Sequence, residues 1–415
     1  MTKQEPMLQG VRVLDFSHYV AGPTCTRILA ELGAYVIKIE RSPEGDHVRR
    51  LGLMADGIST YYFQHNHTKR SLGVDVRCAA GLELLYRLVP KVDVVVENFA
   101  PGVIGAIGLG YEKLSALNPR LVMCSISVAG QSGPLSHKPG YDYIGAAYAG
   151  VADLLGEPDR PPIVPTMAIG DISTGVAAAM AVGMALFNRE RTGHGQLIDA
   201  SLLDTYFHMH EFMVPVLSAR PGRYQWQRSG SQHPTASPYG IYRCRNGYLL
   251  LIVQQHEMER LARAMGTPEL AKDPRFVTPK ARLKNNQALK EIIERWLDGF
   301  ADRDAAVAAL EAERVPCAPV LGLEEAMALP HLRQRGTVRR ADCPGFGELG
   351  LPGMPVRFSN YAYPTGLKVS RVGEDNEVVL REILELSQTE IAGLYDSGAL
   401  LRAAVVSESQ KARRA

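Results

Sequence analysis

Short apolar runs alternate with helical periodicity from residue 11 to residue 127. Residues 11–17 and 35–40 have the β-branched, apolar character of strands, and residues 23–33 between them have helical spacing. Pro23 suits a first helical turn, where its missing N–H would have no partner. Gly33 suits the left-handed position that ends a helix. The pattern therefore predicts a strand–helix–strand unit.

The same alternation continues further along the chain. Strand-like runs occupy residues 70–76, 92–99 and 121–127, and a helical segment lies at 79–89. Repeated units of this kind predict a mostly parallel sheet with helices on both faces. A Pro- and Gly-rich loop at 129–140 follows the last of these strands, at the edge where open α/β sheets bind ligands.

A polar, irregular stretch at 218–238 predicts a domain boundary. Beyond it, two strand-like runs joined at Asn246 and Gly247 predict a hairpin. The predicted division is a large α/β domain from residues 1–217 and 335–415, with a small α+β domain at 225–330.

Length and composition agree with an ordinary soluble protein of two domains. The chain has 415 residues, more than one typical domain core contains. Its net charge of +2 gives no basic surface for nucleic acid. The apolar stretch at 172–187 is shorter than the roughly 20 residues that span a bilayer. No membrane association and no nucleic-acid partner are expected. The cysteines are widely separated, as in a reducing cytoplasm: Cys25, Cys78, Cys124, Cys244, Cys317 and Cys343.

The first strand–helix turn does not match a dinucleotide-binding fingerprint. Glu40 lies at the expected distance, but residues 20–24 read VAGPT and lack the GxGxxG glycines that admit a pyrophosphate. Arg41 stands at the carboxyl end of the second strand, where its guanidinium has two interpretations, a phosphate clamp or a solvated surface charge.

Asp171 precedes an apolar helix rich in Ala and Gly. One interpretation is an N-cap, whose carboxylate accepts hydrogen bonds from the first helical N–H groups. The other is a carboxylate nucleophile, because a helix N-terminus stabilises negative charge and supplies donors for an oxyanion.

Other catalytic patterns are missing from the sequence. The histidine pairs His65/His67 and His208/His210 have no third ligand at metal spacing, so no metal site is predicted. The HExxH and GxSxG motifs are absent as well.

Several segments, in this order and spacing, resemble the class III CoA transferases, the CaiB/BaiF family. They are VRVLDFSHYVAGPTCTRILAELGAYVIKIER, NHTKRSLGVDV, VVVENFAPGVIGAIGLGYEKLSALNPRLV, KPGYDYIGAAYAG, GDISTGVAAAMAVGMAL, RTGHGQLIDASLLD and HPTASPYGIYRCRNGYLLL. The resemblance implies a large Rossmann-like α/β domain formed by both chain ends, a smaller domain in the middle, and an interlocked homodimer.

The resemblance also implies roles for individual residues. Asp171 matches the family's aspartate nucleophile. Where many members carry an arginine, this chain has Ala106, so a phosphate contact is lost or is supplied by Arg77 or Lys138. The implied CoA contacts are Ala21, Arg41, Val74, Asp75, Val76, Arg77, Asn98, Phe99, Lys138 and Tyr141.

The function that the resemblance implies is transfer of CoA from an acyl-CoA donor to a carboxylic acid. We predict succinyl-CoA as the donor and, from the cations before the small domain, a small dicarboxylate as the acceptor. Coenzyme A is then a substrate, and no permanently bound cofactor is expected. Possible partners for the second carboxylate are Arg220, Arg223, Arg228 and His233.

Two other functions stay open. One is an α-methylacyl-CoA racemase, although Tyr141 stands where the racemases carry a histidine base. The other is a non-catalytic CoA-binding protein of the same fold.

Overall fold

The computed structural model describes residues 5–41, 43–223 and 225–402 of the chain. Their internal contacts divide them into two units, each described here by itself. The first unit comprises the described residues up to Ala149, Pro165–His210, and those from Pro330 onwards. The second unit comprises Gly150–Val164 and Glu211–Leu329.

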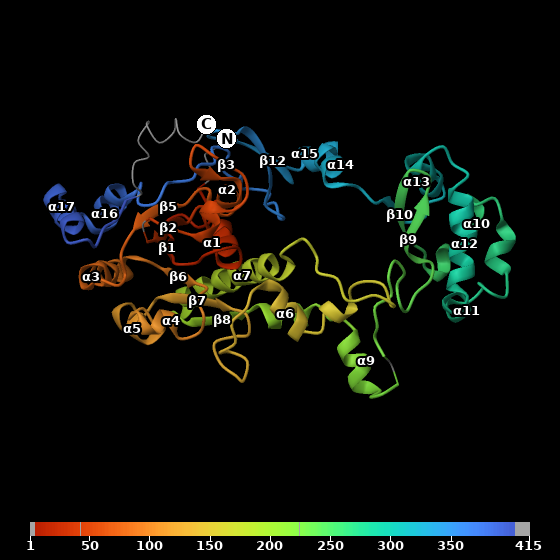
Figure 1. Cartoon of the computed structure of the whole chain (residues 1–415), viewed down its shortest axis with the longest axis horizontal. Coiled ribbons are helices and arrows are strands. Elements are labelled where there is room, and N and C mark those ends of the chain that lie inside the picture. The colour runs from red at the N-terminus through yellow and green to blue at the C-terminus, as the bar shows by residue number, and fades with distance from the viewer. Residues whose placement is uncertain (1–4, 42, 224, 403–415) are drawn as a thin grey trace. The chain divides into compact units, whose positions relative to one another are not determined.

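A six-stranded parallel sheet forms the centre of the first unit (Figure 1). In spatial order its strands are β5 (Arg70–Gly73), β2 (Tyr35–Glu40), β1 (Arg12–Asp15), β6 (Val94–Glu97), β7 (Val122–Ser127) and β8 (Leu197–Ser201). The chain adds β2 and β5 on one side of β1 and then returns to add β6 on the other side. The α/β class and the parallel sheet predicted from the sequence are confirmed, and the reversal between β1 and β6 creates a crevice at their carboxyl ends.

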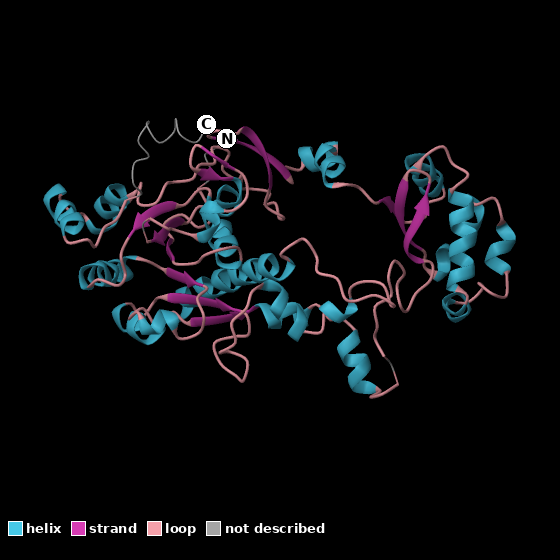
Figure 2. Cartoon of the chain, in the orientation of Figure 1, coloured by secondary structure: helices cyan, strands magenta, loops and turns pink. Residues whose placement is uncertain are grey.

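Helices cover both faces of this sheet, as Figure 2 shows. The helices of the first unit are α1 (Ala21–Glu31), α2 (Thr60–Asn66), α3 (Ala79–Leu88), α4 (Val103–Ala106), α5 (Tyr111–Leu117), α6 (Asp142–Tyr148), α7 (Ile169–Thr192), α8 (Leu202–His208), α15 (Pro330–Gln334), α16 (Asn376–Leu384) and α17 (Gln388–Asp396). Its two short ladders are β3 (Met54–Ala55) with β4 (Ile58–Ser59), and β12 (Val338–Cys343) with β13 (Gly347–Pro352). Its 3-10 helices are η1 (His47–Arg50) and η2 (Val89–Lys91).

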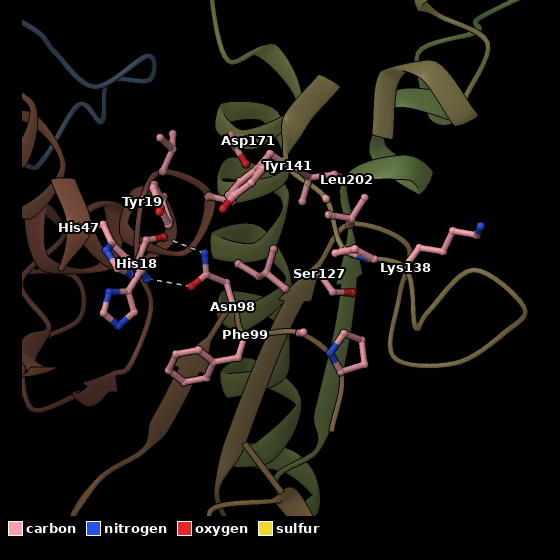
Figure 3. Close-up of a pocket in the computed structure, with 18 of the residues that line it drawn as sticks. His18, Tyr19, His47, Asn98, Phe99, Ser127, Lys138, Tyr141, Asp171 and Leu202 are labelled. Atoms are coloured by element: carbon pink, nitrogen blue, oxygen red, sulfur yellow. Dashed lines mark hydrogen bonds between the residues drawn. The ribbon is translucent and has the colours of Figure 1, made fainter. Parts of the chain in front are cut away.

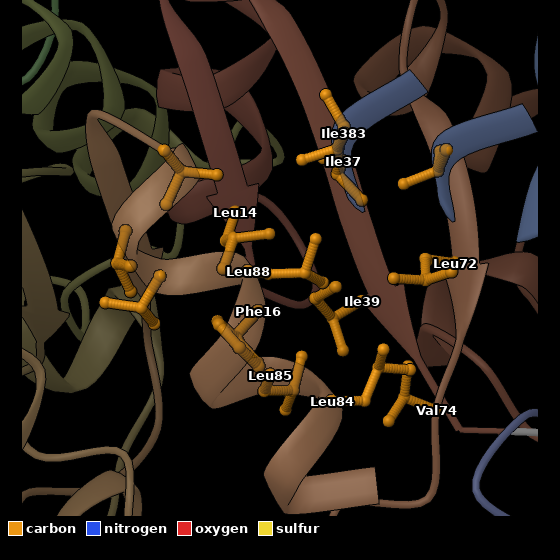
Figure 4. Packing of buried hydrophobic residues seen from close by; sticks show 14 of the residues in the cluster. Leu14, Phe16, Ile37, Ile39, Leu72, Val74, Leu84, Leu85, Leu88 and Ile383 are labelled. Carbon is orange, nitrogen blue, oxygen red and sulfur yellow. The ribbon is translucent and has the colours of Figure 1, made fainter. Parts of the chain in front are cut away.

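Alternating strand residues build two separate cores. Leu14 and Ile37 face one side of the sheet, where they pack with α3 and α16 (Figure 4). Val13 and Val36 face the other side, where α1 and α7 cover them. Because neighbouring strand residues point to opposite faces, both sides of a doubly covered sheet must be apolar, which explains the nearly continuous runs in the sequence.

Among the described residues, α7 is the one helix long and apolar enough to span a membrane by length and composition. It packs against α1 and the sheet, and Ala178 and Val182 are buried in the second core. These contacts are those of a core helix.

The second unit has its own core around a three-stranded antiparallel sheet, β11 (Cys317–Pro319), β10 (Gly247–Ile252) and β9 (Tyr239–Cys244). The predicted hairpin joins β9 to β10, and Asn246 takes the left-handed conformation with φ 61°. The helices are α9 (Met213–Ala219), α10 (Met258–Ala264), α11 (Pro279–Lys284), α12 (Asn286–Leu297), α13 (Arg303–Ala312), α14 (Leu323–Ala328), and the 3-10 helices η3 (Ala152–Leu154), η4 (Gln255–Glu257) and η5 (Pro268–Lys272).

The structure differs from the sequence prediction in two places. Residues 150–164 and 211–217 were assigned to the large domain, but their contacts group them with the second unit. One reason is visible at Arg228, which donates to the carboxylate of Asp153 at 2.7 Å. The predicted edges of the domains otherwise stay a prediction.

Candidate active site

The loops that follow the two central strands are tied together at the crevice. The backbone N–H of His18, after β1, donates to Oδ1 of Asn98, after β6, at 2.8 Å. Nδ2 of Asn98 in turn donates to the carbonyl of His18 at 2.8 Å, and Figure 3 marks both bonds. The pair fixes the rim of the crevice, because the Asn98 amide oxygen accepts from one backbone group of the opposite loop and its amide nitrogen donates to another.

Buried charges hold the β1–α1 loop in a strained conformation. Tyr19 has φ 64°, which is uncommon for a residue with a side chain. Its N–H donates to Asp46 at 3.1 Å, and Lys38 binds Asp46 at 3.0 Å and the carbonyl of Ser17 at 2.6 Å. Burial alone would raise the pKa of Asp46, but Lys38 and His18 lower it overall, so the anion that holds the loop stays charged.

Close helix packing sets the position of Asp171. Gly175 lies one turn after Asp171 on α7, and a Cβ there would come within 2.5 Å of the Ala21 carbonyl and 2.7 Å of Thr24. Only glycine permits this approach of α7 to the first turn of α1. Residues four apart share a helix face, so Asp171 is placed beside the start of α1.

The N-cap interpretation of Asp171 is wrong. α7 begins two residues before Asp171, and Ala168 at its N-cap gives no side-chain cap. The cap comes instead from Asp142 on α6, which accepts the N–H groups of Gly170 at 3.2 Å and Asp171 at 3.3 Å. Tyr206 on α8 also donates its hydroxyl to Asp142. The carboxylate of Asp171 is thereby left for other contacts.

The environment of Asp171 raises its pKa to about 7, first through burial and then through the negative charge of Asp142. No described residue donates a hydrogen bond to this carboxylate. A carboxylate with a raised pKa is a stronger base and nucleophile once ionised, and it is matched to reaction near neutral pH.

A cavity of about 430 Å³ opens at the crevice in front of Asp171. Lys138 is the lysine in its lining, which contains no arginine; in Figure 3 its side chain points away from Asp171. Burial raises the pKa of Tyr61, and the nearby charge of Asp171 raises it further. The polar and aromatic side chains of the lining are His18, Tyr19, His47, Tyr61, Asn98, Phe99, Ser127, Ser136, Lys138, Tyr141 and Asp171.

The cavity brings together six of the residues named from the sequence. These are Ala21, Asn98, Phe99, Lys138, Tyr141 and Asp171, which come from four different segments of the first unit. Tyr141 is exposed, and its ring meets that of Tyr19 edge-on at 5.7 Å. Convergence of distant segments at one cavity is the expected form of a ligand site at a switch point.

A second group of predicted CoA contacts lies outside the cavity. The exposed Arg41 follows β2, and Val74 follows β5, with the Val74 N–H bonded to the Glu40 carbonyl at 2.8 Å. Asp75 binds Arg77 at 3.2 Å; this bond lowers the pKa of Asp75, and Arg41 contributes. Neighbouring strands are about 5 Å apart, so this group stands one or two strands from the crevice along the same edge.

Three further residues named from the sequence, Ala106, Val76 and His233, do not line the cavity. Ala106 ends α4 and is exposed, and Val76 is half-buried in the first core. His233 belongs to the second unit, where its ring stacks on Tyr239 at 4.4 Å, and it does not line the cavity. Its role as a substrate contact stays a prediction.

The sequence did not single out several residues that the structure places at the site. His18 and Tyr19 could have been found, because they directly follow the strand beside the switch point. Tyr61, Asp142 and Tyr206 carried no such signal, since only tertiary packing brings them to Asp171.

Among the described residues no group of three or more His, Cys, Asp or Glu side chains has the arrangement of a metal site. The six cysteines are free thiols.

Together these features define a doubly wound α/β protein that presents a carboxylate at its ligand-binding edge. The sequence matches the family model described as CoA-transferase family III over residues 8–376. The chain therefore belongs to CoA-transferase family III and is a CoA transferase, as its sequence motifs indicated.

Curated relatives cover nearly the whole chain. A succinyl-CoA–D-citramalate CoA-transferase of Chloroflexus aurantiacus is 34% identical, covering 95% of this chain and 98% of its own. A succinate–glutarate CoA-transferase of Agrobacterium fabrum is 34% identical, covering 94% and 98%. A formyl-CoA:oxalate CoA-transferase of Rhodopseudomonas palustris is 32% identical, covering 95% and 97%.

Solved structures agree with the fold. A CaiB/BaiF family protein from Brucella suis superposes with a TM-score of 0.81 at 34% identity, covering 92% of this chain and all of that one. A Mycobacterium tuberculosis protein gives a TM-score of 0.80 at 26% identity, covering 91% and 99%.

Proposed function

We propose that this enzyme transfers CoA from succinyl-CoA to a small dicarboxylate through covalent intermediates on Asp171. The observation that carries the proposal is the carboxylate of Asp171, which lines the cavity, has a raised pKa and receives no hydrogen bond from a described residue. Asp142, not Asp171, caps the N-terminus of α7. A carboxylate nucleophile needs this combination of access and basicity.

The proposed reaction is a series of acyl transfers between the CoA thiol, Asp171 and the two carboxylic acids. An oxygen of Asp171 attacks the succinyl-CoA carbonyl, the C–S bond breaks, and a mixed anhydride and CoA thiolate form. The thiolate then attacks the aspartyl carbonyl and the anhydride C–O bond breaks. Succinate departs, and Asp171 now carries CoA as a thioester. The acceptor carboxylate repeats these steps in reverse and regenerates Asp171, so the energy of the thioester is retained.

Exclusion of water is required because an anhydride hydrolyses readily. The loop at 129–140 supplies Ser136, Lys138 and Pro139 to the cavity lining. This loop is the proposed cover of the site. Closure would also bring Lys138 toward the negatively charged part of a bound substrate.

The names of the relatives support the choice of substrates. Two of them act with succinate or succinyl-CoA and with the dicarboxylates D-citramalate or glutarate. Formyl-CoA and oxalate, the substrates of another relative, are the second candidates.

The cations predicted to hold the second carboxylate do not line the described cavity. Arg228 binds Asp153 at 2.7 Å, and Arg220, Arg223 and Arg228 all belong to the second unit. Within the cavity lining, His18, His47 and Lys138 are the groups that can carry positive charge. We assign the second carboxylate to this set.

The racemase alternative requires two proton-handling groups at the α-carbon. Tyr141 stands where the racemases carry a histidine, so that base is missing. Asp142 is buried and accepts hydrogen bonds from two backbone N–H groups and from Tyr206. We therefore expect transfer without racemisation. Exchange of solvent deuterium into the α-carbon of a chiral 2-methylacyl-CoA at the rate of turnover would reverse this assignment.

The direct test is Asp171→Asn, assayed by mass spectrometry for new thioesters from succinyl-CoA and a panel of acids. Loss of turnover by several orders of magnitude with retained CoA affinity is expected. Asp153→Asn, which removes an exposed carboxylate from the second unit, is the control. Full activity of the Asp171 variant would instead favour a non-catalytic role for this residue, and no transfer from succinyl-CoA to any acid by the wild type would reject the substrate proposal.

We also infer a homodimer. One face of α7 exposes large apolar side chains at four-residue spacing, Ile172, Val176, Met180 and Met184, followed by Phe187. A continuous apolar stripe of this kind is typical of an interface.

A further inference from the structure

A second cavity, of about 250 Å³, lies at the opposite end of α1 from Asp171. α1 has 11 residues, so its ends are about 16 Å apart at 1.5 Å per residue. The first turn of α1 borders the cavity in front of Asp171. Glu31, the last residue of α1, instead accepts a hydrogen bond from Arg339, which lines the second cavity. The two cavities are thus distinct, and residues between Arg335 and Tyr363 line the second one.

Positive charge dominates the second cavity. Its lining includes Arg335, Arg339 and Arg357 and no acidic residue. Arg339 bonds to Glu31 and to the carbonyl of Pro364. Glu31 is the one acidic partner of these three arginines among the described residues, and it is shared with Arg27 at 2.7 Å. The cavity therefore has an excess of positive charge.

Arg335 and Arg357 have guanidinium groups that can still bind an anion. Arg357 donates to the carbonyl of Gln334 at 3.3 Å, a single bond to a neutral acceptor. No described residue accepts a hydrogen bond from the Arg335 side chain. A guanidinium offers five N–H donors in a planar fork, so each group retains the geometry for a phosphate or carboxylate.

Aromatic rings form the remaining walls. Tyr361 donates its hydroxyl to the Glu31 carbonyl at 2.6 Å, and Tyr363 donates to the Val356 carbonyl at 2.9 Å. The two rings meet edge-on at 5.5 Å and are held in place by these bonds. Phe358 also lines the cavity and is 39% exposed. Fixed rings with engaged hydroxyls offer a ligand their faces and edges rather than polar groups.

From this combination we propose that the cavity formed by residues 335–339 and 354–363, whose walls contact the last residue of α1, binds a small planar aromatic anion. The phosphate or carboxylate would bind Arg335 and Arg357, and the aromatic ring would pack against Phe358 and the two tyrosines. The volume suits a ligand of about mononucleotide size and is smaller than the usual site for a large cofactor. The shared chemistry is found in nucleoside phosphates and in aryl carboxylates.

The test is calorimetric titration of the full-length enzyme without CoA, and the arginine variants described below separate binding at this cavity from binding at the transfer site. The probes are adenosine 3′,5′-bisphosphate, adenosine monophosphate, benzoate and inorganic phosphate. Saturable binding of an aromatic anion, tighter than that of inorganic phosphate, is expected. Preference for the nucleotides or for benzoate identifies which source of the chemistry is used, and equal binding of inorganic phosphate would overturn the aromatic part of the proposal.

Variants connect the binding to this cavity. Arg335→Gln and Arg357→Gln are expected to weaken binding at least about tenfold each, as for loss of a charge-assisted hydrogen bond. Arg340→Gln is the matched control, because Arg340 adjoins Arg339 on β12 but pairs with Glu348 and does not line the cavity. Arg339 is left unchanged, since it holds Glu31.

The melting temperature, the CoA-transfer rate and the oligomeric state of the variants distinguish a loss of binding from a loss of folding or assembly. Both arginines are exposed, so the variants should retain the melting temperature and the CoA-transfer rate of the wild type. Undiminished anion binding in both variants, or no binding of any probe to the wild type, would overturn the proposal. A changed oligomeric state with unchanged anion binding would overturn it as well, because the arginines would then serve an interface.

Discussion

At the residue scale, the ionisation of Asp171 sets the pH range of the proposed reaction. Burial and the charge of Asp142 raise its pKa to about 7, and only the ionised form can attack a thioester. The rate of transfer at low substrate concentration should therefore rise about tenfold per pH unit below pH 7 and level off above it. A profile of kcat/KM from pH 5 to 9 checks this. A flat profile across pH 7 would contradict the assignment.

The same raised pKa makes a prediction about stability. The folded protein binds the proton of Asp171 more tightly than the unfolded chain does, so stability contributed by the neutral carboxyl is present at pH 4 and is lost as pH rises through 7. Asp171→Asn should therefore be more stable than the wild type at pH 8, by on the order of 2–4 kcal/mol. At pH 4 the two should match. Chemical denaturation at both pH values measures the difference.

Asp142 should tune Asp171 as well as position it. Asp142→Asn keeps one oxygen, which can accept from the Gly170 N–H and the Tyr206 hydroxyl, and replaces the oxygen that accepts from the Asp171 N–H with an NH2 group. It also removes the negative charge that raises the pKa of Asp171. The midpoint of the pH profile should therefore move to lower pH. Asp153→Asn, in the second unit, should leave the midpoint in place. An unmoved midpoint in the Asp142 variant would limit its role to structure.

At the scale of single elements, the contact between α1 and α7 controls the site. Gly175→Ala should force the helices apart, because the added methyl would meet the Ala21 carbonyl at 2.5 Å. A cost of about 1–3 kcal/mol in stability is expected, with a loss of transfer activity as Asp171 shifts. Gly393→Ala on α17 (Gln388–Asp396), away from this contact and from the proposed dimer face, has open space and should stabilise by about 0.5–1 kcal/mol. Thermal unfolding and the transfer assay compare the two variants.

The elements that the sequence predicted well are those with a clear local pattern. β1, α1 and β2 were found because apolar alternation, Pro23 and Gly33 mark their limits, and Gly33 has φ 101° as predicted. β8 was missed, because this strand at the sheet edge has only Ser201 fully buried and shows no apolar run. The start of α7 was placed too late, since its cap comes from Asp142, far away in the sequence.

Placement of the site residues depended more on tertiary packing. The position of Asp171 at a helix start was visible in the sequence, but its neighbours Tyr61 and Tyr206 come from helices with no shared motif. Arg41 and Arg77 could be assigned to strand ends, yet which of those ends borders the cavity depends on the strand order. Local patterns determine elements, whereas contacts between elements select the residues that meet.

At the scale of the whole molecule, α7 links the candidate nucleophile to the proposed dimer. Its buried side packs on α1 and the sheet, and its first turn carries Asp171. Its other side exposes Met180, Met184 and Phe187, each more than 60% accessible. Burying three such side chains would stabilise association by several kcal/mol, at roughly 1.5–3 kcal/mol each.

Disruption of this stripe should therefore produce monomers. Met180→Glu with Met184→Glu places two carboxylates in the proposed interface, where their desolvation opposes association. Light scattering after gel filtration should show the wild type at twice the 45.4 kDa of the chain and the double variant near that mass. Leu53→Glu, at an apolar residue that is 71% exposed outside α7, should remain dimeric. A dimer that persists in the double variant would move the interface to another surface, and a monomeric wild type would refute the dimer itself.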